Sequence, residues 1–153
     1  MREWHRAPVE CRHYTVLEAF MAVNTNFDPQ KPLELVMSDL EITHRLDQSP
    51  DKPNEGFVQV HVAMKQDDKK NVPYRVKVHL AGNFEIDESF PAEKKEMFLK
   101  TNGASILFGV ARELVRDLTS RGPHNQILLP TISFAEVGRK IKQEETKKQT
   151  AKP

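Results

Sequence analysis

The histidines are the first residues in this sequence that could do chemistry, because imidazole is the commonest metal ligand among side chains. They show no His-Glu-x-x-His spacing, and a single cysteine cannot complete a zinc set with them. His61 and His79 could face solvent together on neighbouring strands, but two imidazoles beside Lys77 make a poor metal site. We therefore predict ordinary surface histidines and no metal at His5, His13, His44, His61, His79 and His124.

The thiol and the carboxylates give no better basis for catalysis. Cys11 and His13 would share one face of a strand, yet no third group orients the pair as a nucleophile requires. The carboxylates of Glu34, Asp39 and Glu41 fit a solvated strand face more simply than an acid–base pair. The sequence also lacks the glycine patterns of dinucleotide sites, phosphate loops and serine hydrolases. It predicts no enzyme and no cofactor.

Length and composition indicate one globular domain. The chain has 153 residues, of which 38% are hydrophobic and 29% charged, so it can bury a real core. Lys plus Arg total 23 against 22 Asp plus Glu, which leaves no overall field favouring nucleic acid or acidic lipid. One cysteine excludes an internal disulfide, no apolar run reaches the ~18 residues of a membrane span, and the N-terminus does not resemble a signal peptide. We expect a cytoplasmic protein with no membrane contact.

The first part of the chain predicts an antiparallel sheet. Apolar and polar residues alternate strictly over 74–86 and again over 57–65, the pattern of strands with one dry and one wet face. The alternation shifts parity between Met37 and Asp39, which predicts a bulge or bend within the strand of 33–46. Residues 14–23 are strand-like but apolar on both parities, so part of this strand should be covered on both faces.

The second part predicts helices. Ser89 offers a cap for a short helix before Gly103, and a long helix over 105–120 ends at Gly122 and Pro123. A weakly amphipathic C-terminal helix carries Val137 and Ile141. The fold class is therefore α+β: a four-stranded antiparallel sheet with one face covered by the long helix, preceded by a short helix and followed by a C-terminal one. We expect a single domain over 1–144 and a disordered tail over 145–153.

The long helix is apolar around too much of its circumference. Its apolar arc spans roughly 200°, about twice the stripe that seats a surface helix on a core. The central residues of the arc, Leu107, Val110, Ala111, Leu114 and Leu118, should pack on the sheet. A second copy of the chain is then the expected cover for the edges of the arc, which are Ile106, Phe108 and Val115.

These segments together resemble the SecB family of bacterial export chaperones. The resemblance runs from Tyr74 to Phe134 and is looser over the first two strands. Its motifs are Gly82-Asn83-Phe84 in a strand, Ile106-Leu107-Phe108 and Ala111-Arg112-Glu113 in the helix, Ser120-Arg121-Gly122 after it, and then an extended segment with a proline that ends at Phe134. It implies the fold given above, a long helix in a subunit interface and a homotetramer built as a dimer of dimers.

The resemblance also implies a function. SecB proteins are ATP-independent holdases that bind unfolded polypeptide in long apolar grooves, and they serve protein export. The positions that match the groove are Phe27, Leu33, Leu35, Phe134, Val137 and Ile141. The loop between the first strands is shorter than in typical export SecB proteins, so the groove is expected to be smaller.

A second departure concerns the translocase motor, which the family contacts through an acidic patch on the solvent face of the sheet. The matching positions here are Asn24, Asp28, Arg75 and Lys77, of which only Asp28 is acidic. A motor surface suited to carboxylates would be repelled by Arg75 and Lys77. The departure weakens the export prediction, so the alternative is a SecB-like chaperone of the antitoxin in a toxin–antitoxin system.

A further alternative is a nucleic-acid-binding module that uses a basic sheet face. Its residues would be Gln59, His61, Lys65, Arg75, Lys77 and His79, with Lys140, Lys142, Lys147 and Lys148 in the tail. The predicted outer face shows no aromatic platform for stacking bases, and the net charge is only +1. We therefore do not expect nucleic acid as a partner.

Overall fold

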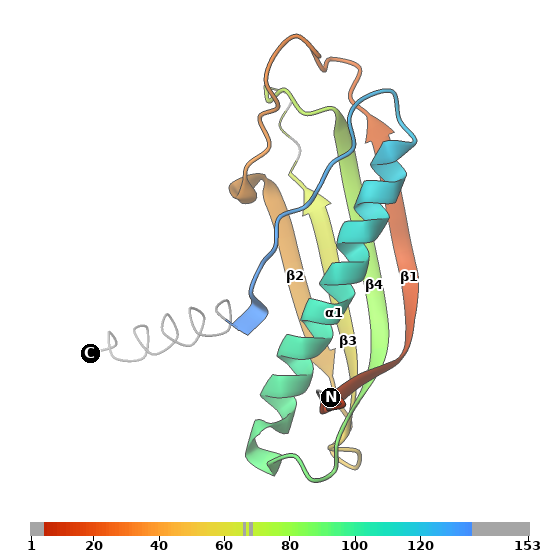
Figure 1. The fold of residues 1–153 in the computed structure, drawn as a ribbon, viewed down its shortest axis with the longest axis vertical. Coiled ribbons are helices and arrows are strands. Elements are labelled where there is room, and N and C mark those ends of the chain that lie inside the picture. The colour runs from red at the N-terminus through yellow and green to blue at the C-terminus, as the bar shows by residue number, and fades with distance from the viewer. Residues whose placement is uncertain (1–4, 66, 68, 136–153) are drawn as a thin grey trace, which may run out of the picture.

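The computed structural model describes residues 5–65, 67 and 69–135. One antiparallel sheet and one long helix form two layers (Figure 1). The elements in chain order are β1 (Val9–Val23), a 3-10 turn (Met37–Asp39), β2 (Leu40–Asp47), β3 (Glu55–Met64), β4 (Tyr74–Ile86) and α1 (Ala92–Ser120). The four-stranded antiparallel sheet with one face covered by a long helix is confirmed.

The strand order is β1-β4-β3-β2, so β1 and β2 are the edge strands. β4 has the predicted bounds, because its burial alternates along nearly its whole length. The parity shift before β2 is a 3-10 turn over Met37–Asp39 rather than a bulge within one strand. The pairing of β1 with β4 shifts register between Cys11 and His13 and again between Val16 and Glu18, so β1 is the irregular strand.

α1 is a single helix of 29 residues. The predicted short helix ending before Gly103 was wrong, and Ser89 does not cap it: Pro91 holds the cap position, and the Ser89 hydroxyl donates to Asp87 instead. A Cβ at Gly103 would lie 2.7 Å from a methyl group of Val58. This glycine therefore allows the helix to approach β3 closely, and the helix continues through it.

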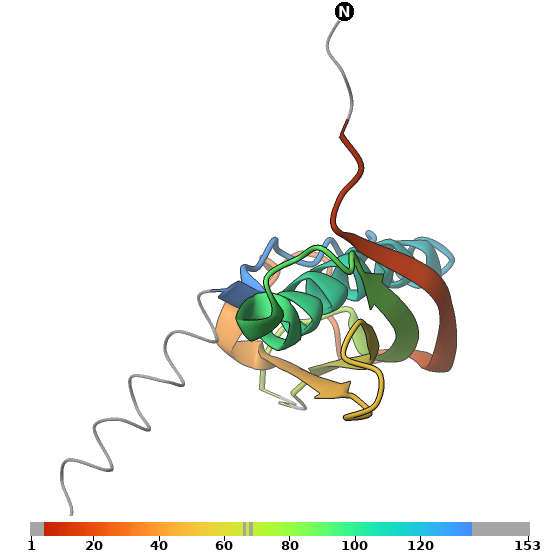
Figure 2. The ribbon, with the colours of Figure 1, turned by 90° about the horizontal axis from the view of Figure 1, so that it is seen from below.

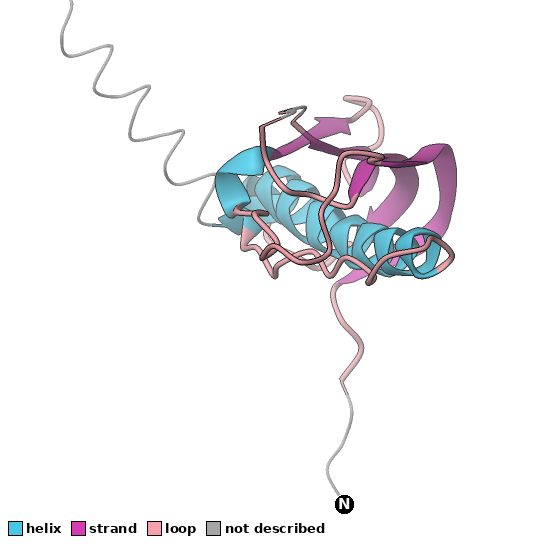
Figure 3. Cartoon of the chain, turned by 90° about the horizontal axis from the view of Figure 1, so that it is seen from above, coloured by secondary structure: helices cyan, strands magenta, loops and turns pink. Residues whose placement is uncertain are grey.

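An extended segment completes the layer above the sheet. We call residues 123–134 the strap; it runs beside α1 on the same side of the sheet (Figures 2 and 3). Ile127, Leu129 and Phe134 are each only 2% exposed and belong to the same core cluster as the sheet and helix residues. Sheet, helix and strap thus enclose one core.

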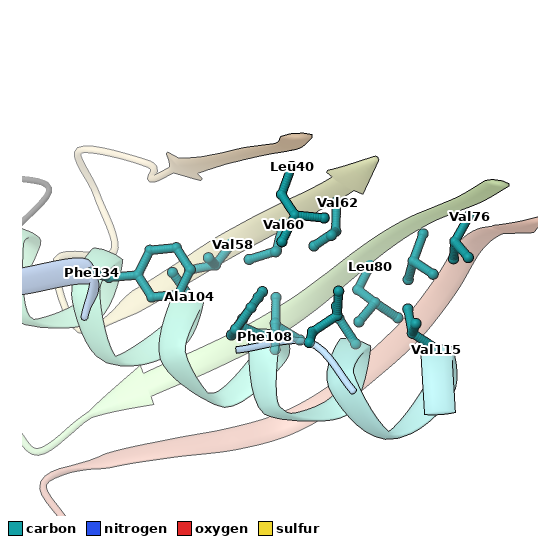
Figure 4. Close-up of a cluster of buried hydrophobic side chains, with 14 of the residues drawn as sticks. Leu40, Val58, Val60, Val62, Val76, Leu80, Ala104, Phe108, Val115 and Phe134 are labelled. Atoms are coloured by element: carbon teal, nitrogen blue, oxygen red, sulfur yellow. The ribbon is translucent and has the colours of Figure 1, made fainter. Parts of the chain in front are cut away.

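The burial of the apolar residues of α1 differs from the prediction. Leu107 and Ala111 are buried against the sheet, as predicted, whereas Val110, Leu114 and Leu118 are only partly buried. Phe108 and Val115, which were expected at the edges of the arc, are 3% and 0% exposed (Figure 4). Within one subunit these two side chains therefore offer almost no free surface, and contact with a second copy through them stays a prediction. Ile106 is still exposed.

The predicted C-terminal helix, with Val137 and Ile141, lies outside the described residues, as does the predicted tail. Phe134 and Ala135 are helical at the end of the described part. None of the helices in this part is both long and apolar enough to cross a membrane.

Candidate functional site

A groove of about 730 Å³ lies between the first half of α1 and the end of the strap. We call it the helix–strap groove. Apolar side chains, among them Met97, Phe98, Ile132 and Phe134, dominate its lining. The full lining consists of Glu93, Lys94, Met97, Phe98, Thr101, Asn102, Ser105, Ile132, Ser133, Phe134 and Ala135.

Aromatic contacts hold the floor of this groove in place. The Phe134 ring lies 5.0 Å from the His44 ring of β2 and 5.7 Å from the Phe108 ring of α1, edge to face in both cases. Phe98 packs against Phe90, with ring centroids 4.6 Å apart. Such pairs contribute about 0.5–1.5 kcal/mol each beyond their area burial. The floor is therefore preformed, whereas Met97 at the rim is 54% exposed and has flexible torsions.

His44 is the titratable group beneath this floor. Its burial, and secondly the charge of Lys100, lower the pKa of His44 below its usual value. Because the neutral form is favoured, the ring acts here as an apolar packing surface for Phe134.

The predicted client-binding residues do not share one cavity. Phe134 lies in the helix–strap groove. Phe27 packs instead on His124, with ring centroids 4.7 Å apart, and Leu35 lines a separate polar cavity. Leu33 is 55% exposed in the loop before β2. Val137 and Ile141 lie outside the described residues, so binding at these positions stays a prediction.

The separate cavity, of about 260 Å³, lies where the loop after β1 meets the hairpin between β3 and β4. Asn24 donates to the Val72 carbonyl there, and Asp39 and Lys70 form a close ion pair. The hydrogen bond from Lys70 lowers the pKa of Asp39. These contacts connect the loops around the cavity, and few apolar side chains line it.

The predicted translocase-contact residues divide between this cavity and the outer face, the sheet face opposite α1. Asn24 and Arg75 line the cavity. Lys77 lies on the outer face and pairs with Glu18 at 3.2 Å. Asp28 accepts the backbone N–H of Gln30 within its own loop.

The outer face carries charged residues at both ends, and the acidic ones form ion pairs with Arg6, Arg12 and Lys52. Arg75 and Lys77 lie at one end, and Glu10, Glu85 and Glu55 are paired in register across β1, β4 and β3 at the other. The His61 and His79 rings lie between these ends with centroids 5.7 Å apart. No group of three or more metal-ligating side chains occurs in the described residues.

Sequence analysis missed an aromatic residue on the outer face and much of the groove. Phe20, opposite Lys77 in register, is 47% exposed on the outer face. Met97 and Phe98 line the groove from α1, and Ile132 lines it from the strap. Neither strand alternation nor helical periodicity indicates that these two segments meet, so the groove was not predictable from local pattern.

The edge strand β1 exposes apolar side chains on both faces. Tyr14 and Val16 pair with Gly82 and Leu80 on the helix face, yet both remain exposed because α1 does not cover this edge. Leu17 lies at the register shift and is 53% exposed. Exposed apolar side chains on an edge strand favour contact with another surface.

Comparison with known proteins identifies the lineage. The sequence model of the family described as "SecB: Preprotein translocase subunit SecB" matches residues 18–145. The chain belongs to the SecB family. No curated protein matches it. Among solved structures, a SecB-like chaperone of Mycobacterium tuberculosis, Rv1957, in complex with a ChAD peptide from the antitoxin Rv1956 HigA1, is 22% identical, with 82% of this chain and 91% of that chain covered and a TM-score of 0.62.

This likeness shows that the SecB-like fold is shared. A protein of unknown function from Streptococcus agalactiae is 13% identical over 80% of this chain and 97% of that one, with a TM-score of 0.46.

Proposed function

We propose that this SecB family member is an ATP-independent holdase that binds non-native polypeptide and catalyses no reaction. The observation that carries the proposal is the helix–strap groove, which is open, apolar and of about 730 Å³. A preformed floor reduces the ordering cost of binding, and the flexible Met97 at the rim suits clients of varied shape. Extended apolar segments of an unfolded chain match this lining.

The proposed physiological role is protein export, which the family's description supports. Chaperoning of an antitoxin is the second candidate, and two observations favour it. Arg75 and Lys77 put positive charge where the resemblance implies an acidic contact with the translocase motor. The structural neighbour from Mycobacterium tuberculosis binds an antitoxin peptide.

We further propose that the protein acts as a homotetramer, a dimer of dimers in the cytoplasm. The exposed apolar residues of β1 support self-association, because an edge strand of 15 residues with apolar groups on both faces is a liability when uncovered. Several grooves in one assembly would hold one client at once, so weak contacts would combine into tight binding.

Aggregation suppression tests the holdase proposal. Guanidinium-unfolded citrate synthase is diluted into buffer with and without the protein, and light scattering is followed without nucleotide. We expect scattering to fall with rising protein and to vanish near a stoichiometric excess. Unchanged scattering at that excess would show that the protein does not hold unfolded chains.

Binding to the translocase motor separates the two roles. We expect weak or no capture of the motor by the natural protein, and a gain in capture with the double substitution Arg75→Glu and Lys77→Glu, measured at low salt. Arg45→Glu, elsewhere on the sheet, is the matched control. Strong capture by the natural protein would favour export.

A further inference from the structure

The backbone of the strap is held by side chains of the body. Within the described part of the chain, residues 125–132 form no backbone–backbone hydrogen bond. The Tyr74 hydroxyl donates to the His124 carbonyl at 2.8 Å and accepts from its N–H at 2.7 Å. Further along, the Thr119 hydroxyl oxygen accepts the N–H of Ile127 at 2.9 Å. The strap is thus an irregular segment fixed at a few points.

Arg112 of α1 makes the last of these attachments before the groove. Its Nε donates to the Leu129 carbonyl at 3.0 Å. Leu129 is only 2% exposed, so its carbonyl needs a donor within the protein. The neighbouring arginines of α1 behave differently, since Arg116 pairs with Glu113 and Arg121 pairs with Asp117. No ion pair of Arg112 occurs in the described residues.

The strap becomes the wall of the groove directly after this attachment. No hydrogen bond from the described side chains or loop backbone reaches residues 130–133. Packing of Ile132 and Phe134 fixes the far end. Arg112 and Phe134 therefore hold the two ends of this wall. Without the Arg112 donor, the buried Leu129 carbonyl would lack a hydrogen bond, and it would regain one from water if the strap moved outward.

We propose that Arg112 is a positioning residue that sets the distance between the strap wall and α1, and with it the width of the helix–strap groove. Its effect on client binding rests on the holdase function proposed above; the geometric part does not. Arg112 does not itself line the groove and acts through the Leu129 carbonyl.

Spin-label distances test the geometry directly. Labels are attached at Thr101→Cys and Ser133→Cys on opposite walls of the groove, in a Cys11→Ser background, and labelled protein is diluted with unlabelled protein to suppress distances between subunits. We expect Arg112→Met to broaden and lengthen the label distance distribution. Arg112→Lys, which restores a donor, should return it toward that of the parent.

Arg116→Met is the matched control, because it removes a guanidinium from the solvent side of the same helix and should leave the distribution unchanged. If Arg112→Met fails to fold by circular dichroism, Arg112→Leu, which also has no donor, takes its place under the same criterion. A distribution equal to that of the parent in the folded variant overturns the proposal.

A binding measurement keeps the two proposals apart. The probe is fluorescein-labelled, reduced and carboxymethylated α-lactalbumin, an unfolded chain. Arg112→Met should weaken its binding about tenfold, with Arg112→Lys in between. If the parent does not bind the probe, the holdase proposal fails while the label distances still decide the role of Arg112. Equal affinities of the parent and Arg112→Met would refute its consequence for clients.

Discussion

Replacing Met97 by alanine should weaken client binding while the chain stays folded. The Met97 side chain is 54% exposed at the rim of the helix–strap groove. Full burial of a methionine gains about 1.5–3 kcal/mol, so a client that covers the exposed half gains roughly 0.8–1.6 kcal/mol from it. Since each 1.4 kcal/mol is tenfold in affinity, Met97→Ala should raise the Kd about four- to fifteenfold. Alanine is the best helix former, which offsets part of the stability lost with the buried half of the side chain.

The assay is fluorescence anisotropy with the labelled α-lactalbumin chain, supported by thermal melts of each variant. Leu128→Ala is the matched control: Leu128 is 66% exposed on the strap and lines no part of the groove. It should bind the probe as the natural protein does. Two results would refute the reasoning, namely an unchanged Kd for Met97→Ala, or an equal loss for Leu128→Ala, which would mean that clients bind any exposed apolar surface.

Three further predictions concern stability. The pKa of His44 is lowered in the folded chain, so acid protonates the unfolded chain first; the contribution of the neutral ring is complete above about pH 6.5 and is lost as pH falls from there toward the folded pKa. The free energy of unfolding of His44→Phe, measured with urea, should therefore depend less on pH across this range than that of the natural protein. Thr119→Val leaves a buried strap amide without an acceptor, and urea unfolding should report a loss of about 1–3 kcal/mol. Thr119→Ser keeps the hydroxyl and removes only a buried methyl group, so it should lose less, about 0.8 kcal/mol. Gly103→Ala should cost about 1–3 kcal/mol because its Cβ meets Val58 at 2.7 Å, whereas Gly109→Ala, with nothing within 4 Å, should gain about 0.5–1 kcal/mol in the same measurement.

The sheet was predictable because one physical pattern dominates it. Each residue of β4 between Tyr74 and Leu80 follows the rule that alternate side chains face opposite sides, and the structure buries the apolar parity. The register shifts of β1 were not predictable from alternation, since both parities there are apolar. The 3-10 turn before β2 shifts the alternation of apolar and polar residues just as a bulge would. The sequence pattern therefore does not distinguish a turn from a bulge, whereas the backbone conformation does.

The errors in the second part have one physical origin, which is packing between segments distant in sequence. Gly103 resembles a helix break in isolation, but the nearness of Val58 on β3 explains it. Phe108 and Val115 resemble edge positions when only a sheet is expected beneath the helix. The strap packs on part of the remaining side, where Phe134 lies against Phe108. The buried Ile127 and Leu129 of the strap form too short a pattern to predict this packing.

The exposed apolar surface that supports self-association lies on β1 and not on α1. Sheet and strap of the same chain cover most of the apolar arc of α1, and Ile106 is its one large residue still exposed. The edge strand instead exposes Tyr14, Val16 and Leu17, together with unpaired backbone groups along its free edge. An aqueous monomer would leave this surface open to aggregation. The tetramer proposal therefore depends on β1: sedimentation of a compact 17.6 kDa particle at micromolar concentration would contradict it, and Val16→Lys should shift an assembly toward smaller species.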